Sequence, residues 1–286
     1  FRRAQGINVK VVDIQNIFDE FSYGMFNPLA MRYFLHFAYN NWAEPIATHV
    51  LLVGDASWDY RFILPDSVIP NYVPSYLDPA RDDKFVSVTG AEKDWYPDFA
   101  IGRIPVQNAQ DLTKIIVNTI RYETAPPPGD WTRRALLVTG GKNWVEQDTF
   151  MGHAHDYEDA MPDDFEFAEV FKQTEGWNNK EHYAQMILEE LNRGALITIF
   201  SGHGARNQWD FVLESSDLYG LHCEGKTPIV LVMTCHTGRF ANPKTSCIGE
   251  EFIMGGDALQ RGLAYWGSTG LTSVWNPYYL TMDLLD

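Results

Sequence analysis

Residues 228–238 read Pro-Ile-Val-Leu-Val-Met-Thr-Cys-His-Thr-Gly, and they decide the expected fold. The first six are apolar, which is typical of a strand buried on both faces of a parallel sheet. A thiol, Cys235, follows the end of this strand. Residues 195–204, Ala-Leu-Ile-Thr-Ile-Phe-Ser-Gly-His-Gly, repeat the arrangement and place His203 after a second strand. Because ligands bind beyond the carboxyl ends of strands in α/β sheets, we expect the chemistry at these two ends.

The same alternation of short apolar runs and longer amphipathic stretches extends along the chain. The runs predicted to be strands are Ile7–Val12, His49–Val53, Phe99–Ile104, Ala135–Val138, Phe165–Phe171, Ala195–Phe200, Pro228–Met233 and Gly262–Trp266. Start and stop signals predict helices over Leu29–Asn41, Leu112–Glu123, Lys180–Arg193, Ile248–Met254 and Tyr278–Leu284. The pattern predicts an α/β protein with mainly parallel sheets flanked by helices.

One segment divides the chain into two parts. Residues 125–130 read Ala-Pro-Pro-Pro-Gly-Asp, and three prolines neither continue a helix nor enter a central strand. The alternation of strands and helices restarts after them. We therefore expect two Rossmann-like α/β subdomains, over residues 1–125 and 130–286. Since the chain begins at Phe1 without methionine, we interpret it as a segment of a longer polypeptide.

The charge balance excludes some classes of partner. Lys and Arg number 22 and Asp and Glu number 38, so the formal net charge is −16. Such a surface repels phosphate backbones and anionic membranes, and no apolar run reaches the length of a membrane-spanning helix. We expect neither nucleic-acid binding nor membrane insertion.

A cysteine and a histidine at neighbouring strand ends point to acyl transfer. His203 and Cys235 are 32 positions apart, which leaves room for one crossover connection, so the two strands can lie side by side. A thiol and an imidazole then form a nucleophile–base pair. The amides of Gly204 and Cys235 are the expected oxyanion hole. Cys247, at the start of a predicted helix, is the second-choice nucleophile, and Cys223 has no expected role.

Several blocks resemble the gingipain-like family of bacterial cysteine peptidases, which has a caspase-like fold. They are His49–Asp55, Asp98–Pro105, Tyr122-Glu123, Ser201–Gly204 with Trp209, Thr234–Phe240 and Ser273–Trp275. They follow the family's order over nearly the whole chain. The resemblance implies that His203 is the general base and acid, that Cys235 is the nucleophile, and that the family's first strand lies upstream of Phe1.

The resemblance also carries expectations about substrate, cofactor and location. It implies a protein or peptide substrate whose P1 side chain, on the acyl side of the cleaved bond, enters a pocket built partly by Ser201, Gly202, Met233 and Trp275. No cofactor is expected for catalysis, but structural calcium is. Family members are secreted or lie on the cell surface, and flanking domains are expected.

Two acidic residues of the gingipains lack an evident counterpart. The glutamate that supports the catalytic histidine aligns with Lys142, which cannot orient an imidazolium; Glu146 or Asp148 can replace it, or the enzyme acts as a dyad. For the acid that gives gingipains their preference for arginine, Asp148 is the nearest candidate and Asp156 a poorer one.

Two acidic regions are candidate metal sites. Carboxylates suited to calcium are Asp55, Asp59, Asp78, Asp82 and Asp83, although they lack EF-hand spacing and equally suit loop capping. His153, His155 and Asp156 lie in a second acidic stretch, which is better interpreted as a solvated helix face than as a metal cluster.

The sequence therefore predicts a cysteine endopeptidase that uses a Cys-His dyad. Two alternatives remain open: a catalytically silent relative that acts as a binding or scaffold domain, and a self-processing protease that cleaves only its own chain.

Overall fold

The computed structural model describes residues 1–44, 46–90, 96–255 and 261–285. By their internal contacts these residues form two compact units. One comprises Phe1–Gln107 with Ala241–Thr245, and the other Asn108–Phe240 with Ser246–Asp286. No helix of the described chain is both long enough and apolar enough to cross a membrane.

The first unit is built on two parallel strands, β1 (His49–Val53) and β2 (Ala100–Ile104). Its helices are a short 3-10 turn at Arg2–Gln5, α1 (Ile14–Ser22), α2 (Leu29–Asn41) and α3 (Asp83–Val86). Apolar side chains of α1 and α2 pack on β1 through Val50 and Leu52. The alternate residue Leu51 is 61% exposed, so this strand is buried on one face.

One predicted strand of the first unit does not form. Residues 7–12 have no strand structure, and Ile7 and Val11 are exposed. Apolar β-branched residues favour an extended chain, but a strand also needs a neighbour for its backbone hydrogen bonds. The only strands described in this unit, β1 and β2, pair with each other.

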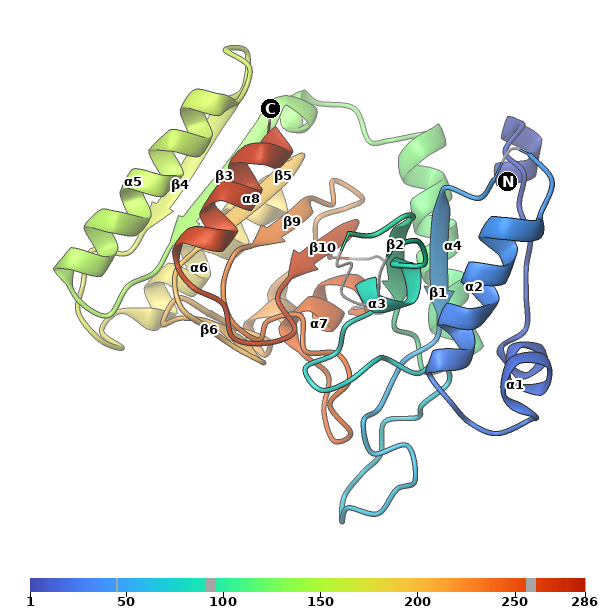
Figure 1. The fold of residues 1–286 in the computed structure, drawn as a ribbon. Helices are drawn as coiled ribbons and strands as arrows, with labels where there is room; N and C mark the ends of the chain where they lie inside the picture. The colour runs from blue at the N-terminus through green and yellow to red at the C-terminus, as the bar shows by residue number, and fades with distance from the viewer. Residues whose placement is uncertain (45, 91–95, 256–260, 286) are drawn as a thin grey trace. The chain divides into compact units, whose positions relative to one another are not determined.

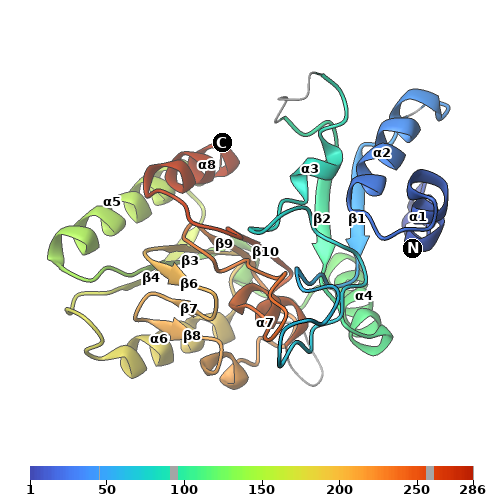
Figure 2. The same ribbon diagram turned by 60° about the horizontal axis from the view of Figure 1, so that its bottom comes forward.

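The second unit contains a five-stranded parallel sheet in the order β10-β9-β5-β3-β4 (Figures 1 and 2). Its strands are β3 (Arg134–Thr139), β4 (Glu166–Phe171), β5 (Ile197–Ser201), β9 (Ile229–Val232) and β10 (Ala264–Gly267). Its helices are α4 (Ala109–Thr124), α5 (Trp144–Ala160), α6 (Lys180–Arg193), α7 (Ile248–Met254) and α8 (Trp275–Leu285), with 3-10 turns at Asp130–Arg133 and Asp217–Gly220. A small antiparallel sheet, β6 (Gly204–Ala205), β7 (Gln208–Trp209) and β8 (Leu213–Glu214), follows β5.

Alternate residues of these strands enter two separate cores. Leu136 and Val138 of β3 face a cluster with α6 and α7, whereas Ala135 and Leu137 face a cluster with α5 and α8. Figure 2 shows these two pairs of helices on opposite faces of the sheet. Burial on both faces explains why β3 is apolar at nearly every position and fully buried.

The proline segment belongs to the second unit. The indole of Trp131 donates a hydrogen bond to the carbonyl oxygen of Pro127 (2.8 Å) and packs against Tyr122 of α4. Helix α4 in turn contacts α7. The division between the units therefore falls before α4, at 107–108, while the boundary expected from the sequence lies at 126–129.

Candidate active site

The chain reverses direction across the sheet next to β3. From β3 it moves outward to β4 and then returns to β5 on the other side of β3, with β9 and β10 beyond. At such a switch point the loops that leave neighbouring strands diverge and create a crevice at the carboxyl edge. The loops that follow β3, β5 and β9 carry the residues of the candidate site.

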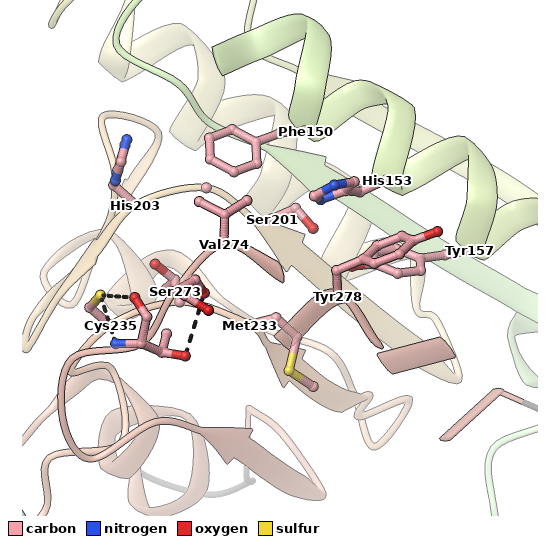
Figure 3. Close-up of a pocket in the computed structure, with 13 residues that line it drawn as sticks. Phe150, His153, Tyr157, Ser201, His203, Met233, Cys235, Ser273, Val274 and Tyr278 are labelled. Carbon is pink, nitrogen blue, oxygen red and sulfur yellow. Dashed lines mark hydrogen bonds between the residues drawn. The ribbon is translucent and has the colours of Figure 1, made fainter. Parts of the chain in front are cut away.

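His203 and Cys235 follow two hydrogen-bonded neighbours in this sheet. Strands β5 and β9 are parallel, with Phe200 opposite Val232, as the sequence analysis expects. Both functional residues line one pocket, and Figure 3 shows the imidazole and the thiol at the same end of it. Parallel pairing in this register therefore brings residues 32 positions apart to one site.

The Cys235 thiol is held by the loop that precedes α8. Its Sγ accepts a hydrogen bond from the Thr272 amide (3.4 Å) and donates one to the Thr272 carbonyl oxygen (3.5 Å). The next residue, His236, has a φ of 61°, in the left-handed region that few non-glycine residues adopt. The turn lies four residues beyond the end of β9, and the Cys235 thiol before it is half-buried at the pocket wall.

The other two cysteines are enclosed. Cys247 is 1% exposed, and burial raises the pKa of its thiol well above the usual value. Burial likewise raises the pKa of the Cys223 thiol to about 12. A thiol must become a thiolate and reach its substrate to act as a nucleophile. Of the three, Cys235 alone meets the second requirement.

Glu146, one of the two carboxylates considered from the sequence as partners of the histidine, lies beside His203. Its Oε2 lies 3.1 Å from Nε2 of His203 and accepts a hydrogen bond from the Lys142 amide (2.7 Å). Burial raises the pKa of Glu146, but these hydrogen bonds and the nearby positive charges outweigh it, so the net pKa lies below its ordinary value. The carboxylate is therefore ionised and positioned to orient the imidazole.

The start of α5 places Glu146 beside the histidine. The side chain of Asn143 caps the helix by accepting hydrogen bonds from the amides of Val145 and Glu146. Asn and Glu three residues apart are a helix-start signal that the sequence does contain. Asp148, two residues further along, is exposed and does not line the pocket.

The sequence analysis missed a buried carboxylate, Asp210, that binds the backbone of the histidine loop, the loop after β5 that carries His203. Asp210 is 3% exposed, and its Oδ2 accepts hydrogen bonds from the amides of Gly141 (2.6 Å) and His203 (3.3 Å). The ammonium group of Lys172, fully buried, donates to the carbonyl oxygens of Gly141 and Gly176. Burial lowers the pKa of Lys172, while the charges of Asp210 and Glu146 oppose that shift.

Two glycines next to His203 allow close approach of the backbone. A Cβ atom at Gly202 would lie 2.6 Å from the ring of Phe200, and one at Gly204 would lie 2.7 Å from the carbonyl oxygen of Cys235. A side chain at Gly204 would push the histidine loop away from the cysteine loop, and one at Gly202 would push it away from Phe200 and Gly140. Glycine at position 204 is therefore needed to bring the two loops together.

The pocket next to the thiol and imidazole is lined by thirteen residues (Figure 3). They are Phe150, His153, Tyr157, Ser201, Gly202, His203, Met233, Thr234, Cys235, Thr272, Ser273, Val274 and Tyr278. Three expected substrate-binding residues, Ser201, Gly202 and Met233, are among them. Trp275 and Gly204 do not line the pocket, although the ring of Trp275 packs against that of His153.

Comparison with known proteins identifies the family. The sequence model of peptidase family C25 matches residues 1–284. The chain belongs to peptidase family C25. This confirms the gingipain resemblance, and with it membership in a family of cysteine peptidases.

Similar proteins agree with this assignment. Lys-gingipain of Porphyromonas gingivalis is 24% identical over 273 residues, which cover 91% of this chain and 14% of that protein. An uncharacterised protein of Archaeoglobus fulgidus is 24% identical over 302 residues, covering 93% of this chain and 70% of its own length. The C25 chain therefore spans a small part of Lys-gingipain and most of the archaeal protein.

Solved structures share the fold. The complex of the pro- and mature domains of RgpB from P. gingivalis superposes with a TM-score of 0.72 at 18% identity, over 93% of this chain and 60% of that one. The Arg-specific proteinase gingipain R (RgpB) gives 0.70 at 18% identity, over 99% and 64%. At this identity the match shows a gingipain-like α/β fold.

The carboxylates considered for calcium in this C25 chain have protein partners. Asp55 is fully buried and accepts hydrogen bonds from the Ala56 amide and from Gln107, and burial raises its pKa to about 7. Asp59 accepts two amides and the Ser67 hydroxyl, Asp82 binds Arg103, Asp83 binds Arg81, and Asp78 is exposed. These bonds fit loop capping, and calcium binding stays a prediction.

A different trio has the geometry of a metal site. Ligand atoms of His155, Glu158 and Glu169 lie within 4.8 Å of one another, the one such group among the described residues. His153 is not part of it, because it faces the pocket while His155 lies on the exposed side of α5. Exposed acidic groups are common without a metal, so this trio remains a geometric observation.

Proposed function

We propose that this C25 chain is the catalytic part of a cysteine endopeptidase, with Cys235 as nucleophile and His203 as general base and acid. The observation that carries the proposal is the ordered set at one sheet edge: an ionised Glu146 bonded to His203, and an accessible Cys235 on the neighbouring strand end in the same pocket. Nucleophile, base and orienting carboxylate together are the arrangement that acyl transfer requires.

The proposed reaction follows from these positions. With Nε2 held by Glu146, Nδ1 of His203 takes the proton of the Cys235 thiol. The thiolate attacks the peptide carbonyl carbon, and the amides of Gly204 and Cys235 are proposed to stabilise the oxyanion. The C–N bond breaks as His203 returns the proton to the leaving amine. Water, deprotonated by the same imidazole, then hydrolyses the thioester and restores the thiol.

The proposal extends to substrate and setting. Proteins or peptides are the substrates, no cofactor is needed for the chemistry, and calcium has at most a structural role. Since the chain is much shorter than Lys-gingipain, flanking domains and secretion or display on the cell surface are proposed from the family alone.

Labelling with a peptidyl acyloxymethyl ketone at neutral pH tests the nucleophile. We expect one adduct, located at Cys235 by peptide mapping, and Cys235→Ala should lower kcat/KM on peptide substrates on the order of 10⁴-fold or more. Denatured protein, in which all three cysteines react with a simple alkylating reagent, is the control for detection.

Three outcomes separate the alternatives. A folded protein that leaves Cys235 unlabelled and cleaves no peptide is a scaffold. A protein that cleaves only its own chain, with the change in mass abolished by Cys235→Ala, is self-processing. Cleavage that survives Cys235→Ala contradicts the proposed nucleophile.

A further inference from the structure

The pocket beside Cys235 is lined by no acidic side chain that could pair with a basic side chain of a substrate. None of its thirteen lining residues is Asp, Glu, Lys or Arg. Neither candidate from the sequence lines the pocket: Asp148 is exposed, and so is the poorer candidate Asp156, whose Oδ2 accepts a hydrogen bond from the hydroxyl of Tyr278 (2.9 Å). An arginine or lysine buried here would lack the carboxylate that offsets its desolvation.

Aromatic rings narrow the pocket from the α5 and α8 sides. The ring of His153 lies 4.4 Å from that of Tyr278 and 6.3 Å from that of Phe150, centroid to centroid. Tyr157, 1% exposed, is hydrogen-bonded to Ser201 and Thr281. The cavity that remains is about 30 Å³, room for roughly two water molecules. This space suits a short side chain better than a long one.

One polar atom in the wall lacks a partner. His153 is 6% exposed, and its Nε2 makes no hydrogen bond within the described part of the chain. Figure 3 shows the imidazole directed from α5 towards Ser201 and the pocket. Buried polar groups are nearly always hydrogen-bonded. Nε2 is covered by its neighbours although the residue lines the pocket, so a small shift of the wall would let a ligand group in the pocket supply the missing partner.

We propose that His153 and the aromatic wall around it select a short, uncharged amide, the side chain of asparagine, as the P1 residue of the substrate. This inference rests on the proposed peptidase function, because the P1 side chain is the one that enters the cavity next to the attacked carbonyl. An amide carries both a donor and an acceptor, so it satisfies Nε2 in either tautomer of the imidazole.

Shape and charge distinguish asparagine from its close analogues. Aspartate and leucine both have nearly the same shape as asparagine. Leucine, however, leaves Nε2 of His153 without a partner, and aspartate brings a negative charge. Burial lowers the pKa of His153, although Asp156 opposes the shift, so the ring is neutral at pH 7 and offers no counter-charge to aspartate. The preference thus differs in kind from that of the Arg-specific gingipain R, whose fold this chain shares.

The decisive experiment is a P1 scan with fluorogenic peptides that differ only in Asn, Asp, Leu, Arg or Lys. We expect kcat/KM for Asn to exceed that for Leu by roughly 10²-fold, and Arg and Lys to be the poorest. His153→Leu should reduce the Asn/Leu ratio to near one, and His153→Gln, which returns a hydrogen-bonding group near the Nε2 position, should restore part of it. His155→Leu, on the exposed side of the same helix, is the matched control and should leave the ratio unchanged.

Binding to the Cys235→Ala protein provides a second measurement that needs no turnover. Calorimetric titration with the same intact peptides should show the tightest binding for Asn, again lost in Cys235→Ala/His153→Leu. A protein that prefers Arg, Lys or Leu, or that binds all five peptides alike or none, overturns the assignment of His153. Asn-selective binding without cleavage would instead overturn the proposed peptidase activity and leave the pocket assignment standing.

Discussion

The loops that follow β1 and β5 begin with similar residues but place them in different surroundings. Each follows a parallel strand, and each has a glycine next to an ionisable residue: Gly54-Asp55 after β1 and Gly202-His203 after β5. Asp55 is fully buried, and both of its oxygens accept hydrogen bonds from its own unit. The side chain of His203 is 37% exposed and lines a pocket with a thiol.

This comparison shows that an ionisable residue at the end of a strand is not enough to form a functional site. The carboxylate of Asp55 is occupied in joining the start of its loop to Gln107. His203 is instead held by its backbone, through Asp210, and at one ring nitrogen by Glu146, so its ring remains available at the pocket. We expect substitutions after β5 to affect catalysis and those after β1 to affect folding.

The largest effect should come from His203→Ala. Without the imidazole no group at the pocket accepts the thiol proton or returns one to the leaving amine, so kcat/KM for peptide cleavage should fall about 10³- to 10⁴-fold. His222→Ala, an exposed histidine elsewhere in the second unit, is the control. A decrease in kcat/KM of less than tenfold would contradict a catalytic role for His203 and would remove the contrast with Asp55.

Glu146→Gln should have the next largest effect. The amide preserves the size of the side chain but removes the negative charge that stabilises the imidazolium, so kcat should drop roughly 10²-fold with little change in KM. Asp148→Asn, an exposed carboxylate on the same helix, should change neither constant. Equal effects of the two substitutions would reject Glu146 as the residue that positions His203.

Asp210→Ala should affect both stability and activity. It leaves the buried amides of Gly141 and His203 without their shared acceptor, which should lower the free energy of unfolding by about 1–3 kcal/mol. The loosened loop should also lower kcat about tenfold, because a small misplacement of a catalytic group is enough to slow the reaction. Urea denaturation and steady-state kinetics measure the two effects. A change in stability with unaltered kcat would make Asp210 purely structural.

No effect on activity is expected at Asp55, where the predicted effect is on the pH dependence of stability. Burial raises its pKa to about 7 in the folded state, whereas an unfolded aspartate titrates near pH ~3.9. Its contribution to stability is therefore fully present below pH ~3.9 and is lost as pH rises to about 7. Urea midpoints between pH 4 and 8 should fall with pH from this group, and Asp55→Asn should flatten that part of the curve. An unchanged slope in the variant would contradict the raised pKa.

Much of the second unit could be read from local pattern. The alternation of apolar runs and capped helices predicts β3, β5, β9, α6 and α7 to within a few residues, because burial on two sheet faces requires continuous apolar strands. Parallel neighbours then require His203 and Cys235 to meet at one edge. The first unit was less predictable, because residues 7–12 have strand-like composition without a partner strand.

The residues that complete the site were less accessible to sequence reasoning. Glu146 could be named only as one of two substitutes for the missing carboxylate, since its role depends on how α5 is directed after β3. Asp210 and the orphaned nitrogen of His153 have no local signature. Both residues are identified by what surrounds them, namely two backbone amides in one case and a ring of aromatic side chains in the other.

The amino-acid sequence by itself determined the α/β class, the parallel pairing and the two strand ends that carry a thiol and an imidazole, because these follow from apolar periodicity and chain direction. Only the tertiary structure decided that Glu146 supports His203, that Asp210 holds its loop, and that the pocket is neutral and aromatic. Those properties depend on distances and burial among residues far apart in the chain, which no local pattern records.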